Sequence, residues 1–168
     1  MQVCQKLNSN RTRFNFLMIM SNLKFSLVIP KTQAQFERYF YLRWQILRQP
    51  WDQPLGSEKD EYEKNSFHIM AVADDEVIGV GRVHSVGDDV FQIRYMAVDE
   101  KYRNNGVGSA IIEAMEKQAA LLGAKKIILN ARENAIGFYQ KKGYSIIAPA
   151  HSLFGVIKHF KMEKAVSR

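Results

Sequence analysis

The chain of 168 residues is long enough for one domain with a single core, and its 46% of hydrophobic residues is typical of a globular protein. Its formal net charge of +7 suits an anionic small-molecule partner but is modest for a dedicated nucleic-acid-binding protein, because the cations are scattered among acids. The single cysteine, Cys4, excludes an internal disulfide and a cysteine-rich metal site, and we expect no metal.

The first 22 residues carry cations and no acid, and we expect a disordered leader there, followed by one domain over residues 23–168. No apolar run approaches the roughly 18 residues of a membrane span. The short apolar run 16–20 follows basic residues, but no small-residue cleavage site comes after it, which argues against a signal peptide. With the lone cysteine, these features favour a cytoplasmic protein that does not contact membranes.

The first half of the chain predicts one helix and four strands. Strand 23–29 ends at Pro30, and Thr32 is a good N-cap for a helix that runs to about Arg48. The strands that follow are joined by short polar turns, which indicates an antiparallel meander. These three strands are expected at 67–73, 77–83 and 91–98.

The second half predicts two helices and three short strands. A helix over 107–122 has apolar residues at helical spacing and is closed by Gly123. It crosses over to strand 126–129, which should therefore run parallel to the strand before the helix. The fold class is α/β, with a mixed, largely antiparallel sheet and helices on both faces. The remaining elements are a helix over 134–143 and strands at 144–148 and 156–162.

A glycine-bearing turn joins the third meander strand to the following helix. Glycines leave the backbone free to turn tightly and to be approached closely, and the first turn of a helix has unpaired N–H groups with a partial positive charge. Such a turn is an anion cradle, for which phosphate is the usual ligand. The turn consists of Arg103, Asn104, Asn105, Gly106, Val107 and Gly108.

This turn follows a strand that ends in Met96, Ala97 and Val98, and some thirty residues later comes the segment Ala-Ile-Gly-Phe-Tyr-Gln-Lys-Lys-Gly-Tyr over 135–144. Together the two motifs resemble the acyl-CoA-binding core of the GNAT superfamily of N-acyltransferases, over roughly residues 76–164. The resemblance implies an N-acetyltransferase that uses acetyl-CoA to acetylate a primary amine of a small molecule or peptide.

The resemblance also implies roles for particular residues. The cradle would bind the phosphates, and the strand before it would carry a bulge and diverge from the next strand to admit the pantetheine arm. Backbone groups of Met96, Ala97 and Val98 would bind that arm and polarise the acetyl carbonyl. Tyr139 matches the family tyrosine that protonates the departing thiolate.

Other site residues are less constrained by the resemblance. The family usually has asparagine seven residues before its tyrosine, where this chain has Arg132, which could replace that cofactor contact with a charge, and Asn134 could cap the next helix or reach the cofactor. His84 or His159 could accept the proton of the amine, although a water relay is an alternative because strand 91–97 lacks a carboxylate. Arg94 would alternate with Met96 on one strand face and could hold an acidic group of the acceptor.

Three other functions compete with this interpretation. A non-catalytic acyl-CoA-binding module would keep the cradle and lack a working acid. A nucleic-acid-binding domain would need its cations on one face. A dinucleotide fingerprint at Gly79 and Gly81 is weak, because His84 occupies its third glycine position and no helix follows. The acceptor amine and the oligomeric state are left open.

Overall fold

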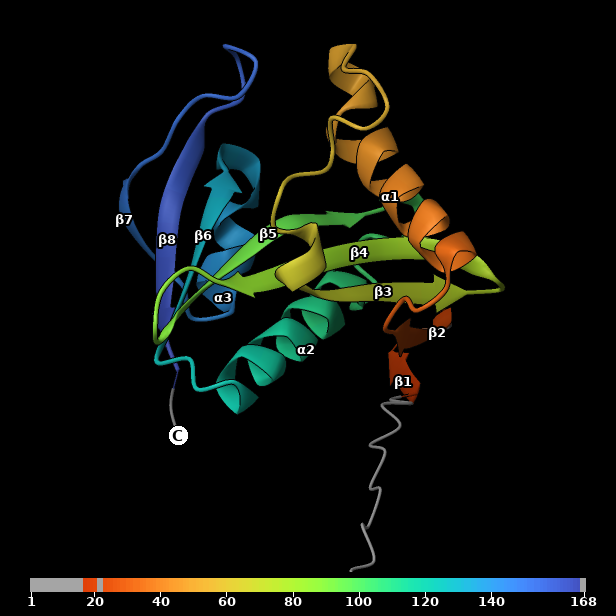
Figure 1. The fold of residues 1–168 in the computed structure, drawn as a ribbon, viewed down its shortest axis with the longest axis horizontal. Coiled ribbons are helices and arrows are strands. Elements are labelled where there is room, and N and C mark those ends of the chain that lie inside the picture. The colour runs from red at the N-terminus through yellow and green to blue at the C-terminus, as the bar shows by residue number, and fades with distance from the viewer. Residues whose placement is uncertain (1–16, 21–22, 167–168) are drawn as a thin grey trace, which may run out of the picture.

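Eight strands form one sheet in the order β1-β2-β3-β4-β5-β6-β8-β7 (Figure 1). The computed structural model describes residues 17–20 and 23–166. All paired strands are antiparallel except β5 and β6, which are parallel as the crossover helix predicts. The strands are β1 (Leu17–Met20), β2 (Leu23–Val28), β3 (Phe67–Ala73), β4 (Glu76–Ser85), β5 (Val90–Val98), β6 (Lys126–Arg132), β7 (Ser145–Pro149) and β8 (His159–Ala165).

Helices α1 and α2 cover opposite faces of the sheet, which confirms the predicted fold class (Figure 1). Helix α1 begins where predicted, because the hydroxyl of Thr32 accepts a hydrogen bond from the N–H of Gln35 at 3.2 Å. The helices are α1 (Gln33–Leu47), α2 (Val107–Leu121) and α3 (Ile136–Lys141), with short 3-10 turns η1 (Gln49–Trp51), η2 (Glu63–Asn65), η3 (Glu100–Tyr102) and η4 (Glu133–Ala135).

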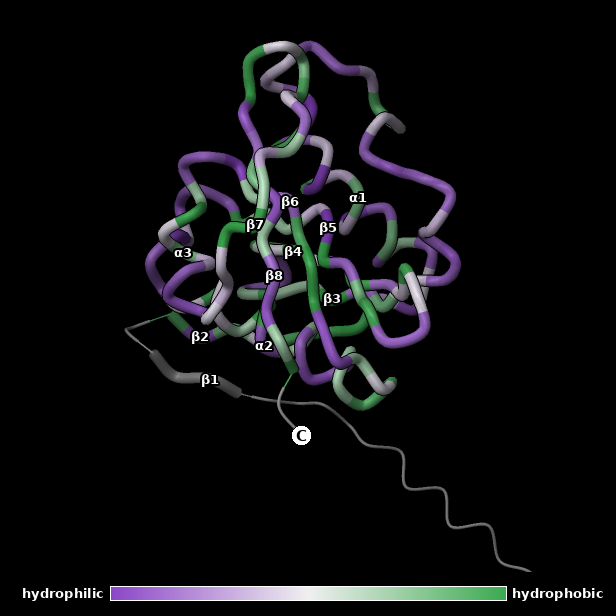
Figure 2. Tube along the Cα trace, turned by 90° about the vertical axis from the view of Figure 1, so that its left-hand side faces the viewer, coloured by the Kyte–Doolittle hydropathy of each residue, from purple (hydrophilic) through white to green (hydrophobic). Residues whose placement is uncertain are grey.

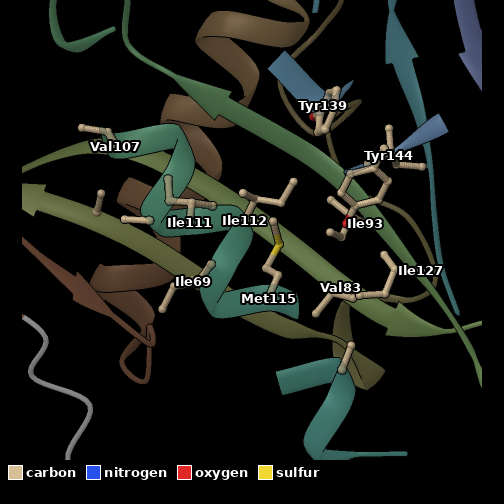
Figure 3. Close-up of a cluster of buried hydrophobic side chains, with 14 of the residues drawn as sticks. Ile69, Val83, Ile93, Val107, Ile111, Ile112, Met115, Ile127, Tyr139 and Tyr144 are labelled. Atoms are coloured by element: carbon tan, nitrogen blue, oxygen red, sulfur yellow. The ribbon is translucent and has the colours of Figure 1, made fainter. Parts of the chain in front are cut away.

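Helix α2 packs its apolar side on the sheet and builds the main core. Ile111, Ile112 and Met115 are fully buried and lie against Ile69 and Val83 of the strands (Figure 3). Hydrophobic residues accordingly concentrate in the central strands, while the outer loops are mostly hydrophilic (Figure 2). This packing fixes the start of α2, and with it the predicted cradle, at the end of β5.

Two glycines of β4 allow α2 to approach the sheet closely. A Cβ on Gly79 would lie 2.7 Å from Cδ1 of Ile111, and one on Gly81 would lie 2.8 Å from Cγ2 of Ile111 and from Cε of Met115. These glycines therefore serve helix packing rather than a dinucleotide site.

We predict that Gly81→Ala destabilises the protein by about 1–3 kcal/mol, because the added methyl group would force a branched core side chain to move. Gly137→Ala is the matched control, since a Cβ there would have no heavy atom within 4 Å. Gly137 lies in α3, where alanine favours the helix by up to about 1 kcal/mol. Urea unfolding of both variants tests this, and equal midpoints would contradict it.

The structure differs from the sequence prediction at several elements. Residues 17–20 form strand β1 paired with β2, although we expected no structure before residue 23; residues 1–16 and 21–22 lie outside the described part. Strand β6 continues to Arg132 because β8 pairs with it along its whole length. Asn134 does not cap the next helix: it lies within η4, and Ala135 occupies the N-cap of α3. The last strand begins at His159 rather than at 156.

Candidate active site

Strand β5 carries a bulge at the position where the pantetheine arm was expected. Arg94 pairs with Arg82 and Ala97 pairs with Val80, so two residues of β5, Tyr95 and Met96, lie opposite one residue of β4. Tyr95 has φ 54°, an uncommon conformation for a residue with a bulky side chain. Such strained residues gather at functional sites, where the surrounding structure holds them in place.

Beyond this bulge, β5 separates from β6. The two strands are paired only from Val90 to Ile93 of β5, although β5 continues to Val98 and β6 to Arg132. Backbone groups on the β6 side of residues 94–98 therefore have no ladder partner in β6 and can bond to a ligand. The bulge and the separation confirm the geometry expected for this strand.

The predicted cradle lies at the start of α2. Gly106 is the N-cap with φ 80°, and the cap has no side-chain hydrogen bond. The first N–H groups of α2 have no acceptor within the helix, so they are available to an anion. The side chain of Arg103 is half exposed, with its Nε 3.4 Å from the carbonyl oxygen of Val98. Asn104 has φ 62°, and Nδ2 of Asn105 donates to the carbonyl of Arg103.

Tyr139 links the cradle to the separated end of β5. Its hydroxyl lies 3.7 Å from Sδ of Met96, and a Cβ on Gly108 would contact Met96 and Phe138 at 3.4 Å. Tyr139 is buried, and burial raises its pKa to about 12 against the opposing effect of the Arg132 charge. The phenol is therefore protonated at neutral pH and can act as an acid. The remaining predicted cofactor residues are Ala97, buried toward α1; Val98 and Val107, packed in the core; and Asn134, exposed on η4.

The two candidate bases lie in different surroundings. His84 is buried and stacks on Tyr62 at 4.8 Å between ring centroids. His84 pairs with Gln92 of β5, which precedes Met96 by four residues. At about 3.3 Å per residue, His84 therefore lies roughly 13 Å from Met96 along the strand direction. His159 lies opposite Arg132 at the end of β6 and stacks on His151.

His159 is in a state suited to accepting a proton. Nδ1 lies 2.9 Å from the carbonyl oxygen of Ile157, and a carbonyl only accepts, so this hydrogen bond keeps the proton on Nδ1 and a lone pair on Nε2. Burial lowers the pKa of His159, and the charges of Arg132 and Arg48 lower it further, against the hydrogen bond to Ile157. The ring is therefore neutral at pH 7.

Arg94 and Met96 do not share a face, contrary to the sequence prediction. The bulge lies between them: Met96 contacts Tyr139 on the α2 side, whereas Arg94 pairs with Asp60 at 3.0 Å beneath α1. Asp60 also pairs with the fully buried Arg82. Because Arg94 already has Asp60 as an ion-pair partner, this arginine is a poor candidate for holding the acceptor.

Other features of the described residues lie away from this site. A pocket of about 660 Å³ beside α1 is lined by that helix, by the loop near Leu55 and by Asp99, and it includes none of the predicted site residues. In the described part of the chain, no three histidine, cysteine, aspartate or glutamate side chains gather closely enough to hold a metal ion. No helix of this part is long and apolar enough to cross a bilayer.

Comparison with known proteins identifies relatives of this chain. The model of the acetyltransferase (GNAT) family matches residues 36–144. YjcF of Bacillus subtilis, an uncharacterized N-acetyltransferase, is 34% identical over 137 residues, which cover 82% of this chain and 97% of that protein. Two solved structures share the fold: an aminoglycoside 6′-N-acetyltransferase complexed with coenzyme A (TM-score 0.71, 17% identity, 84% and 97% of the two chains) and an acyl-CoA N-acyltransferase from Pseudomonas aeruginosa (TM-score 0.68, 18% identity, 85% and 99%).

Proposed function

Because the chain belongs to the GNAT family of acetyltransferases and is therefore an acyltransferase, we propose that it transfers the acetyl group of acetyl-CoA to a primary amine. One observation carries the proposal: Met96 lies beside the phenol of Tyr139, and its Cε would lie 3.4 Å from a Cβ on the cradle glycine Gly108. This proximity supports an arrangement in which the proposed phosphate site, the separated end of β5 and the proposed acid adjoin one another. The likeness to a structure complexed with coenzyme A supports the donor.

Different residues have different roles in the proposed reaction. The cradle, Arg103 to Gly108, binds the phosphates of the donor, and backbone groups of Met96, Ala97 and Val98 orient its arm. A backbone N–H in this stretch would stabilise negative charge that develops on the acetyl oxygen. His159 removes the proton of the attacking amine through Nε2, and Tyr139 supplies a proton to the departing thiolate.

Release of free thiol from acetyl-CoA in the presence of a panel of amines tests the proposal, with the acetylated product identified by its mass. We expect at least one amine to raise thiol release above the rate without amine. Binding of acetyl-CoA by calorimetry without turnover of any amine would instead favour the non-catalytic acyl-CoA-binding module.

We predict that Gly106→Val weakens acetyl-CoA binding tenfold or more, which is about 1.4 kcal/mol. Gly106 has φ 80°, which valine rarely adopts, and its side chain would also cover the helix N–H groups. Gly143→Val is the matched control, since Gly143 has φ 87° at the end of α3, outside the cradle. Calorimetry measures the affinity. Unchanged affinity in folded Gly106→Val would contradict the cradle assignment.

We predict an acidic limb in kcat/KM below pH 6.5, because the folded-state pKa of His159 is lowered and only the neutral ring accepts a proton. Activity should rise as the pH increases through this limb. A second limb, caused by deprotonation of the acceptor amine, should shift in pH with the pKa of the acceptor used. His159→Gln should remove the first limb and lower turnover at least tenfold, whereas His84→Gln should keep the limb. The reverse result would make His84 the base.

A further inference from the structure

Arg48 and Arg132 lie at the transfer end of the site, beyond the separated end of β5. Arg48 follows α1, with its Cζ 5.5 Å from the ring centroid of Tyr95 and 5.6 Å from that of Phe154. Phe154 comes from the β7–β8 connection and stacks on Trp51 of η1. This contact brings the end of α1 to the β7–β8 connection, and the two rise on the same side of the sheet (Figure 1).

Arg132 is the second arginine of this arrangement. It ends β6, opposite His159 of β8, whose ring stacks on His151 at 5.6 Å. The charge of Arg132 acts on Tyr139, and the charge of Arg48 acts on Arg132. We call Arg48 and Arg132 the arginine pair. The charge of the cradle residue Arg103 also acts on Arg132, so the arginine pair lies near the predicted acid and base and within electrostatic range of the cradle.

The arginine pair has no acidic partner. Among the described residues, no carboxylate lies within 4.0 Å of either guanidinium, whereas Arg82 and Arg94 share Asp60. Arg48 donates from Nε and Nη1 to the carbonyl oxygens of Ser57 and Leu47, and its side chain also interacts with Tyr95, so its hydrogen-bond partners are neutral groups. The side chains of the arginine pair are also partly buried. Burial, together with the neighbouring positive charges, lowers the pKa of Arg132.

Two half-buried cations whose charges act on each other, and which have no acidic partner among the described residues, are unfavourable, and such an arrangement points to an anion that a ligand supplies. The phosphates of the donor belong to the cradle. A guanidinium fork fits a carboxylate with two parallel hydrogen bonds, while it repels a polycation. We infer, resting on the proposed acetyl transfer, that the acceptor is a small amine that also carries a carboxylate, bound by Arg48 and Arg132. Polyamines and aminoglycosides are then poor acceptors.

Matched acceptors test this inference in the wild-type protein. Each of a panel of amino acids is compared with its carboxamide, and spermidine, kanamycin and phosphoethanolamine represent polycationic and phosphate-bearing amines. The α-amine of a carboxamide has a lower pKa, so intrinsic reactivity favours the amide, and any preference for the acid must come from binding. We expect kcat/KM for at least one acid to exceed that of its amide tenfold or more.

Variants of the arginine pair then test whether these two residues cause the preference for the acid over its amide. We expect Arg48→Gln and Arg132→Gln to lower kcat/KM for the acid at least tenfold more than kcat/KM for its amide, with acetyl-CoA affinity unchanged. Arg48→Lys should recover part of the loss because it keeps the charge. Arg38→Gln, at an exposed arginine of α1, is the control and should change neither kcat/KM.

The outcomes separate this inference from the proposed function. Equal use of acid and amide, or better use of spermidine, kanamycin or phosphoethanolamine, would overturn the inference and leave acetyl transfer standing. Weaker acetyl-CoA binding by Arg48→Gln and Arg132→Gln would assign the arginine pair to the donor, and this result would also overturn the inference about the acceptor. Acetyl-CoA binding with no thiol release for any amine would refute the proposed function itself. The wild-type comparison needs no variant to fold.

Discussion

Tyr139→Phe is expected to lower turnover by about 10²–10⁴-fold, the usual contribution of a general acid, while the fold and the affinity for acetyl-CoA are kept. The substitution retains the ring, which packs edge-on against Phe138 and Tyr144, and removes only the hydroxyl beside Met96. A fall in turnover with unchanged cofactor affinity would mean that the lost interaction is made only in the transition state.

The high pKa of Tyr139 shapes this expectation. A phenol with a pKa of about 12 is a weaker acid than a thiol, whose ordinary pKa is about 8.5, so complete proton transfer to a free thiolate is uphill, and the hydroxyl is expected to act chiefly by donating a hydrogen bond to the charge that develops on sulfur. Tyr144→Phe is the matched control: its ring lies 5.9 Å from that of Tyr139, and its hydroxyl has no contact with Met96. Turnover of Tyr139→Phe within twofold of wild type, with chemistry limiting the rate, would assign Tyr139 to the core alone.

The cradle and the acid could be predicted because local patterns encode them. Gly106 lies where a strand pattern changes to a helix pattern, and the α2 pattern around Ile111 and Met115 has the spacing of a buried helix face. The family resemblance then supplied the bulge and the position of Tyr139. Both arise from short stretches of chain whose conformation depends little on distant residues.

The side of the site beneath α1 could not be predicted in the same way. Asp60 bonds to Arg82 and Arg94, which lie 22 and 34 residues away, and no periodicity links these positions. The bulge also places Arg94 and Met96 on different faces, because one extra residue moves the side chains beyond it to the other face. Arg48 gave no signal in the sequence: its surroundings come from η1 and from Phe154, more than a hundred residues later.

These long-range contacts hold the strained bulge in place. The ring of Tyr95 has four guanidinium groups around it, with Cζ of Arg43 at 3.9 Å, Arg94 at 4.8 Å, Arg82 at 5.0 Å and Arg48 at 5.5 Å from its centroid. Asp60 and Glu63 pair with three of these guanidinium groups, those of Arg43, Arg82 and Arg94. The network thus stabilises the backbone conformation on which the candidate active site depends, and it leaves Arg48 without a counter-ion.

Asp60→Asn is therefore expected to destabilise the protein by about 3 kcal/mol, since the buried Arg82 would then share Glu63 with the buried Arg43, and one carboxylate would serve two buried charges. Asp60 bonds to both terminal nitrogens of Arg82, which has no exposed side-chain surface. Asp89→Asn is the matched control: Asp89 pairs with Lys125 at 2.9 Å, but both side chains are exposed, and the midpoint of unfolding should barely change.

The pH dependence of this difference provides a second test. Burial alone would raise the pKa of Asp60, but hydrogen bonds from Arg82 and the Tyr62 N–H, with the charges of Arg82 and Arg94, outweigh it and lower the pKa to about 2. The unfolded-state value is about 3.9, so the contribution of Asp60 is complete above that pH and is lost as the pH falls toward 2. The stability difference between wild type and Asp60→Asn, measured by urea unfolding, should therefore shrink between about pH 4 and pH 2. A difference that stays constant over this range would show that the ionised carboxylate of Asp60 is not what stabilises the network.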